Sequence, residues 1–270
     1  QVFGRLAYNP STASELWSRE FEKRFGAEAG PILEEAIHKA SWILPTIVAA
    51  CSPYAKFPTT RGWAEKQRFG TLPMYAKAEG SDIQQFASFD TEARILIEGG
   101  ETASRLPSST SLWFFRTHQE LEILISKAVE AGPGSENREF ISTLTDLSIL
   151  SNLALYHSRR IPAAVSYCIY KRTGDPFALE DAIAYESRAI EAWADIVEAA
   201  GDVYAPDLMM GVRSADYKGI NNRLSGHWRD ELGYLNEELA ELKMERKALP
   251  DREEARNSPV YREAAPVKYK

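Results

Sequence analysis

Residues 136–173 read ENREFISTLTDLSILSNLALYHSRRIPAAVSYCIYKRT, and this stretch decides the fold. Apolar side chains recur along it at helical spacing, from Phe140 through Leu147 to Cys168. This spacing predicts one long helix with a single apolar face. Pro162 lies inside it, and it predicts a kink because proline has no N–H to donate.

The residues after this stretch predict a tight turn into a second helix. Gly174 can adopt a positive φ at a helix end, the Asp175 side chain can cap the next helix, and Pro176 suits a first helical turn. The next apolar stripe consists of Leu179, Ile183, Ile190, Trp193 and Val197. We therefore expect the two helices to form an antiparallel hairpin.

Helical periodicity continues outward on both sides of the hairpin, and no segment shows strand alternation with hairpin turns. The sequence predicts an all-α, multi-helix bundle with antiparallel hairpins and one long ordered loop region. Helices are expected over residues 11–25, before Gly26; 31–51, kinked at Pro45; 111–131, with Leu112 and Phe115 on the apolar stripe; and 228–249. We expect a helical domain over 11–250 and an extended or disordered tail over 251–270.

Composition excludes several classes of function. The chain has 270 residues, 44% hydrophobic content and a net charge of -7, whereas non-specific nucleic-acid binding needs clustered cations. The longest apolar run, Ser41 to Cys51, is shorter than the roughly 20 residues that span a bilayer. We expect neither a nucleic-acid nor a membrane partner.

The sequence contains no recognisable catalytic or metal-binding motif. Cys51 and Cys168 lie far apart among apolar residues, which predicts two buried free thiols, and His157 lies on an apolar stripe as a core residue. A zinc-protease motif, a glycine-rich phosphate loop and a nucleophile elbow are all absent from the sequence. We therefore predict no catalytic residue, no metal ligand and no cofactor for this chain.

Residues 52–90 interrupt the helical pattern and form the first candidate binding segment. Aromatic residues are frequent there, and basic residues outnumber acids between Lys56 and Lys77. Aromatic rings can cover the apolar face of a sugar while guanidinium groups bind its carboxylate. This makes Arg61, Trp63 and Arg68 candidate substrate-binding residues. In the alternative interpretation, the aromatic side chains pack under a neighbouring domain and the cations remain in water.

Residues 201–226 form the second irregular segment and end beside His227 and Trp228. These two residues are candidates for ligand contact at the start of a helix. Helix capping and packing is the alternative, because a single histidine without a carboxylate or serine partner is weak evidence for catalysis.

Glu186 offers a third interpretation, an enzyme that uses buried carboxylates. It lies on an apolar stripe, where a charged group needs a partner, and Asp146, Asn152 or Arg159 on the preceding helix could supply one. A buried carboxyl with a raised pKa could act as an acid catalyst, whereas structural pairing is the simpler role.

The N-terminal residues resemble a known family. FGRLAYNP at 3–10, ELW at 15–17 and RFG at 24–26 resemble family-67 glycoside hydrolases, the α-glucuronidases, where the chain leaves the catalytic barrel for a C-terminal helical domain. RTGDP at 172–176, AW at 192–193, VYAPDL at 203–208 and GHW at 226–228 are similar to the helical ends of large bacterial proteins thought to handle polysaccharides. In the α-glucuronidases the catalytic carboxylates belong to the barrel, so the resemblance transfers no catalytic residue.

The resemblance implies a non-catalytic accessory domain in a carbohydrate-active enzyme. Residues 1–10 would be the remnant of an upstream barrel, which would be the main partner, with an acidic carbohydrate and a homodimer as further partners and a periplasmic or extracellular location. The alternatives are a helical interaction or dimerisation module and the independent enzyme above. An accessory domain should expose apolar residues near 2–8, an interaction module should expose the leucine seam of 232–249, and an enzyme should contain a closed pocket with carboxylates.

Overall fold

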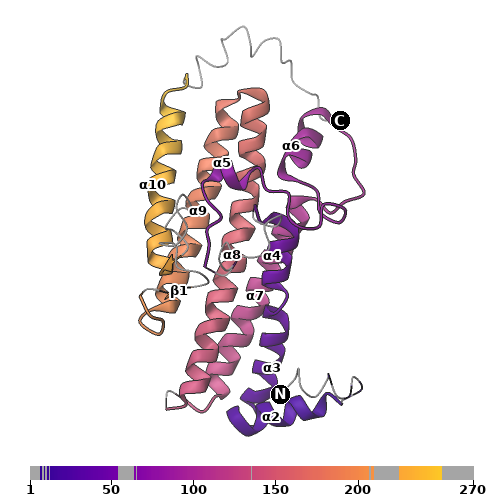
Figure 1. Cartoon of the computed structure of the whole chain (residues 1–270), viewed down its shortest axis with the longest axis vertical. Coiled ribbons are helices and arrows are strands. Elements are labelled where there is room, and N and C mark those ends of the chain that lie inside the picture. The colour runs from indigo at the N-terminus through magenta and orange to yellow at the C-terminus, as the bar shows by residue number, and fades with distance from the viewer. Residues whose placement is uncertain are drawn as a thin grey trace.

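The computed structural model describes residues 13–53, 66–134, 136–206, 208–209 and 225–250, with the single residues 7, 9, 11 and 64. In this part of the chain the fold is an all-α bundle with one short strand pair (Figure 1). The helices are α2 (Glu15–Phe25), α3 (Ala29–Ala40), α4 (Ile43–Cys51), α5 (Leu72–Tyr75), α6 (Phe89–Glu98), α7 (Pro107–Ala131), α8 (Arg138–Thr173), α9 (Pro176–Ala200) and α10 (Trp228–Lys247). The strands β1 (Leu208–Met209) and β2 (Ser225–Gly226) pair antiparallel. Within the described residues, no helix has the length and apolar character that crossing a membrane requires.

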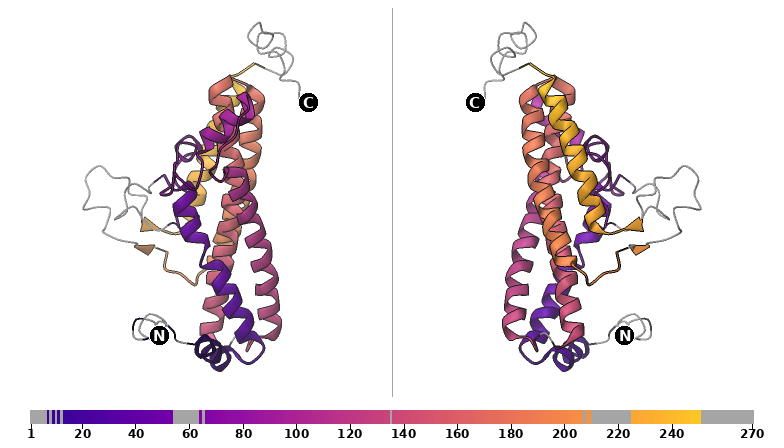
Figure 2. Two further views of the ribbon diagram at one scale, coloured as in Figure 1. Left: turned by 90° about the vertical axis from the view of Figure 1, so that its right-hand side faces the viewer. Right: turned by 90° about the vertical axis from the view of Figure 1, so that its left-hand side faces the viewer.

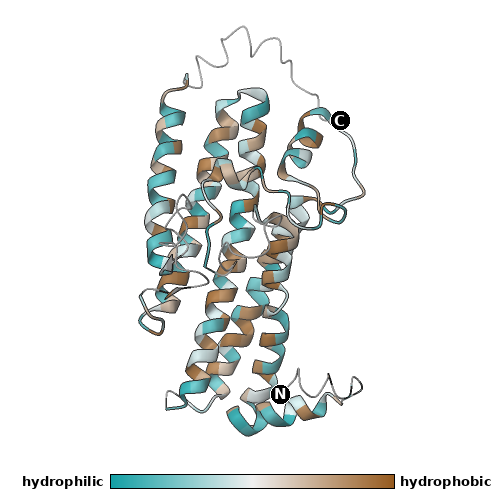
Figure 3. Cartoon of the chain, viewed as in Figure 1, coloured by the Kyte–Doolittle hydropathy of each residue, from teal (hydrophilic) through white to brown (hydrophobic). Residues whose placement is uncertain are grey.

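Helix α8 is the axis of an elongated bundle (Figures 1 and 2). It packs against α9 and α7 along much of its length and against α6 at one end, while α10 covers α9 and α3 covers α7. Hydrophobic residues are frequent on the ribbons where these helices meet (Figure 3), and they supply the buried core. The predicted all-α bundle is confirmed.

The structure also confirms the predicted hairpin of α8 and α9, including the turn that joins the two helices. The Asn137 side chain accepts a hydrogen bond from the Phe140 amide at 3.0 Å and caps the start of α8. Gly174 ends that helix with φ of 72°. The Asp175 carboxylate then accepts from the Phe177 amide at 2.9 Å and caps α9.

Two prolines act differently from each other in the structure. The predicted helix over 31–51 is divided in two, because Pro45 cannot donate to the Ser41 carbonyl and α4 starts anew at Ile43. Trp42 lies at this joint and is 59% exposed. Pro162, by contrast, lies inside the continuous helix α8.

Candidate functional site

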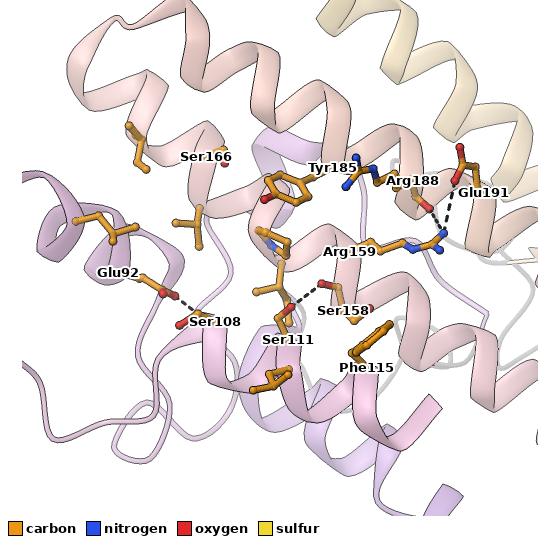
Figure 4. A pocket seen from close by; sticks show the side chains of 16 residues that line it. Glu92, Ser108, Ser111, Phe115, Ser158, Arg159, Ser166, Tyr185, Arg188 and Glu191 are labelled. Atoms are coloured by element: carbon orange, nitrogen blue, oxygen red, sulfur yellow. Dashed lines mark hydrogen bonds and ion pairs between the residues drawn. The ribbon is translucent and has the colours of Figure 1, made fainter. Parts of the chain in front are cut away.

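In the described part of the chain, a groove of about 960 Å³ lies over α8. Helices α6, α7 and α9 form its walls (Figure 4). Its exposed large hydrophobic side chains are Leu96, Leu112, Phe115 and Tyr185. A cluster of exposed apolar side chains in one concavity is typical of a binding surface.

The floor of the groove is built around Pro162. Because residue 162 has no N–H, the Ser158 carbonyl four residues earlier lacks its helical partner. The Ser111 hydroxyl of α7 donates to this carbonyl at 2.6 Å, which ties α7 to α8 (Figure 4). The carbonyl that Pro162 leaves without a helical donor is thus satisfied by a side chain from the neighbouring helix.

Replacing Ser111 by alanine is expected to lower the free energy of unfolding by about 1 kcal/mol, because the Ser158 carbonyl would lose its donor in a partly buried place. Urea denaturation measures this change. Ser109→Ala is the matched control on the same helix, since Ser109 is exposed and its side chain makes no hydrogen bond to the described residues. An equal loss in both variants would contradict this role of Ser111.

Charged residues are held at both ends of the groove. Arg159 donates to the Arg188 carbonyl at 2.7 Å and lies 3.7 Å from the Glu191 carboxylate (Figure 4). At the other end the Glu92 carboxylate accepts from the Ser108 amide at 2.8 Å, which satisfies a free N–H in the first turn of α7. Both carboxylates that line the groove therefore have structural partners.

A buried ionic network lies on the other side of α8. The Arg160 guanidinium pairs with the Glu186 carboxylate at 3.1 Å and donates to the carbonyls of Gly70, at 2.8 Å, and Arg68. It also lies 4.7 Å from the centre of the Tyr75 ring. Burial raises the pKa of Glu186, and the positive charge of Arg160 opposes this shift.

This network does not form the pocket that the enzyme interpretation requires. The partner of Glu186 is Arg160, one residue from the predicted Arg159, and Asp146 instead accepts a hydrogen bond from the Tyr204 hydroxyl. Glu186 is 2% exposed and does not line the groove. The described residues contain no group of three or more side chains that could hold a metal ion.

His157 lies beside the network, fully buried in an aromatic cluster. Its Nδ1 atom is 3.0 Å from the Tyr75 hydroxyl, and its Nε2 atom is buried without a partner. Burial lowers the pKa of His157 to about 3 and raises the pKa of the neighbouring Cys51 thiol to about 12. Both groups are therefore uncharged near neutral pH, and Cys51 and Cys168 are buried free thiols as predicted.

The candidate sugar-binding residues separate into two groups. Arg61 and Trp63 lie outside the described residues. Arg68 is 4% exposed, and its guanidinium pairs with Glu231 at 2.7 Å and with Glu238 at 2.8 Å. The expectation that the cations of this segment stay in water is wrong for Arg68, because two carboxylates of α10 draw it into the core.

His227 and Trp228 have structural roles at the start of α10. The His227 ring accepts from the Arg229 amide at 3.3 Å, and the Asp230 carboxylate accepts from the His227 amide at 2.7 Å, which forms a capping box. Trp228 is buried, and its carbonyl accepts from the Trp193 indole at 2.9 Å. The geometry favours the capping and packing alternative.

Sequence reasoning missed the groove because its residues come from four helices. Leu112 and Phe115 lie on the apolar stripe that predicts a core face of α7, yet both are exposed, and the buried residue between them is Phe114. The helix has apolar residues on two faces, so periodicity alone does not show which face is covered.

The described residues form an all-α bundle with an apolar groove over α8. No family model matches the chain, and no curated protein sequence matches it. The fold is similar to part of a solved structure, a GH138 enzyme targeting pectin rhamnogalacturonan II, with a TM-score of 0.74 and 15% sequence identity. The match covers 92% of this chain but only 37% of that chain.

Proposed function

We propose that this chain is a non-catalytic helical accessory domain of a carbohydrate-active enzyme, and that it docks on a catalytic domain through the groove over α8. The similarity to a glycoside hydrolase structure supports the proposal, because the shared fold makes up about a third of that larger enzyme. The proposal includes the predicted relationship to family 67, the upstream barrel as a partner, and a homodimer.

The observation that carries the docking proposal is the exposed apolar lining of the groove. Phe115 is 42% exposed beside Leu112 and Leu96, in a concavity whose carboxylates are already engaged. Apolar surface of this kind is stabilised when it is covered by another protein surface. A domain of the same enzyme fits as the occupant, since the related fold occurs within a longer chain.

The leucine seam of α10 does not provide the surface that the interaction-module alternative requires. Leu235, Leu239 and Leu242 are all buried, and α10 packs against α9. The apolar patch expected near residues 2–8 by the accessory interpretation lies almost wholly outside the described residues, since only Ala7 is described. The groove over α8 is therefore the surface to test.

Placing a charge in the groove is expected to weaken docking. The chain and the catalytic part of its parent enzyme are produced as separate polypeptides, and their association is measured by analytical ultracentrifugation. Phe115→Asp should raise the Kd at least about tenfold, because a buried aspartate would have no partner. Ile123→Asp is the matched control, since Ile123 lies on the same helix, is 56% exposed and does not line the groove. Unchanged association in the Phe115 variant would overturn the docking site.

A further inference from the structure

A second cavity lies away from the groove, where the joint between α3 and α4 faces the start of α7. Its volume is about 500 Å³, within the range of small-molecule sites. The residues that give it chemical character are Lys39, Trp42, Gln85, Arg105, Trp113 and Glu120. None of them has a part in the docking site proposed above.

The first wall depends on the break at Pro45. Because the helix restarts there, Trp42 stands at the joint as the residue before α4 rather than on a continuous helix face. The Thr46 hydroxyl donates to the Trp42 carbonyl at 2.7 Å and fixes the backbone of the joint. Trp42 is nevertheless 59% exposed, which is unusual for the largest apolar side chain in a fold with a well-formed core.

The opposite wall is held by backbone pairing. The Arg105 amide donates to the Gln85 carbonyl at 2.7 Å, and the Ala87 amide donates to the Arg105 carbonyl at 2.9 Å. The Arg105 guanidinium lies 5.4 Å from the centre of the Phe86 ring. This pairing fixes the backbone from which the Arg105 and Gln85 side chains extend at the cavity.

Two features suit a polar ligand with apolar faces. Within the described residues the side chains of Gln85 and Arg105 make no hydrogen bond or ion pair, so both retain free donors. Trp42 and the half-buried Trp113 supply aromatic rings. Lys39 and Glu120 form an ion pair at 2.8 Å at the same cavity, which leaves Arg105 as the uncompensated charge among the described residues that line it.

We propose that this cavity binds an acidic oligosaccharide, with the indole ring of Trp42 against the apolar face of one sugar and Arg105 paired with its carboxylate. An aromatic ring next to free planar donors matches the alternating C–H faces and hydroxyl groups of a sugar ring. The choice of a saccharide rests on the proposed function. The cavity itself does not depend on docking.

The test is calorimetric titration of the whole chain with trigalacturonate, with neutral galactotriose as the comparison. We expect saturable binding of trigalacturonate and weaker binding of galactotriose. Trp42→Ala and Arg105→Gln should each raise the Kd for trigalacturonate about tenfold or more. Both side chains are exposed, so circular dichroism should show an unchanged fold.

Two further variants separate this site from the others. Phe115→Ala lies in the docking groove and should leave the Kd unchanged. An Arg61→Ala, Trp63→Ala double variant tests the predicted loop contact. Two results would overturn the proposal: the double variant loses binding while Trp42→Ala keeps it, or the native chain shows no saturable binding. Neither result would change the docking measurement.

Discussion

Replacing Arg160 by methionine is expected to lower the free energy of unfolding by about 3–5 kcal/mol. The Glu186 carboxylate is 2% exposed and would be left buried without its cation. The Gly70 carbonyl would lose its donor as well, and the Arg68 carbonyl would keep only the Tyr156 hydroxyl, so the segment that contains both residues would be held less tightly to α8. Urea denaturation followed by circular dichroism measures the change, and we expect the variant to unfold at a much lower urea concentration.

A double variant separates the unpaired charge from the lost packing. Arg160→Met combined with Glu186→Leu removes both charges, so it should recover a large part of the stability lost in the single variant. Lys39→Met is the control for an ion pair at the surface, and its loss should stay below about 1 kcal/mol because its pair with Glu120 is exposed. If Arg160→Met lost no more stability than Lys39→Met, the buried pair of Arg160 and Glu186 would contribute no more to stability than an ion pair at the surface.

The helices and their ends could be predicted because the signals for them are local. Each of these signals acts within four residues of its own position. Asn137 supplies a side-chain cap, Gly174 a positive φ and Asp175 a second side-chain cap. The hairpin of α8 and α9 follows from these positions. The two helices of the hairpin are adjacent in the chain, so their ends can be predicted without knowing which distant segments they contact.

The networks and the groove could not be predicted, since they depend on which distant segments meet. Arg68 pairs with Glu231 and Glu238, more than 160 positions later in the chain. Nothing near Arg68 in the sequence distinguishes it from a solvent-exposed cation. In the same way, Phe115 is exposed in a groove that residues of four helices line together, and nothing near Phe115 in the sequence shows that arrangement.

The buried state of His157 predicts a strong pH dependence of stability. Its pKa is about 3 in the folded chain, because burial penalises the charged ring, whereas the ordinary value is 6.5. Below pH 6.5 the unfolded chain therefore binds a proton that the folded chain does not bind. The contribution of His157 to the free energy of unfolding is therefore complete above pH 6.5. It is lost as the pH falls toward 3, at about 1.4 kcal/mol for each pH unit.

Between about pH 7.5 and pH 5, His157 alone should account for about 2 kcal/mol of lost stability. Burial also lowers the pKa values of His118 and His227, which act in the same direction, so a comparison with a variant is needed. His157→Asn retains a polar group opposite the Tyr75 hydroxyl but cannot titrate. Urea denaturation of both proteins at the two pH values should show that the variant loses about 2 kcal/mol less than the native chain. Equal losses would mean that the His157 ring is protonated in the folded state, and its unpartnered Nε2 atom would then need an acceptor.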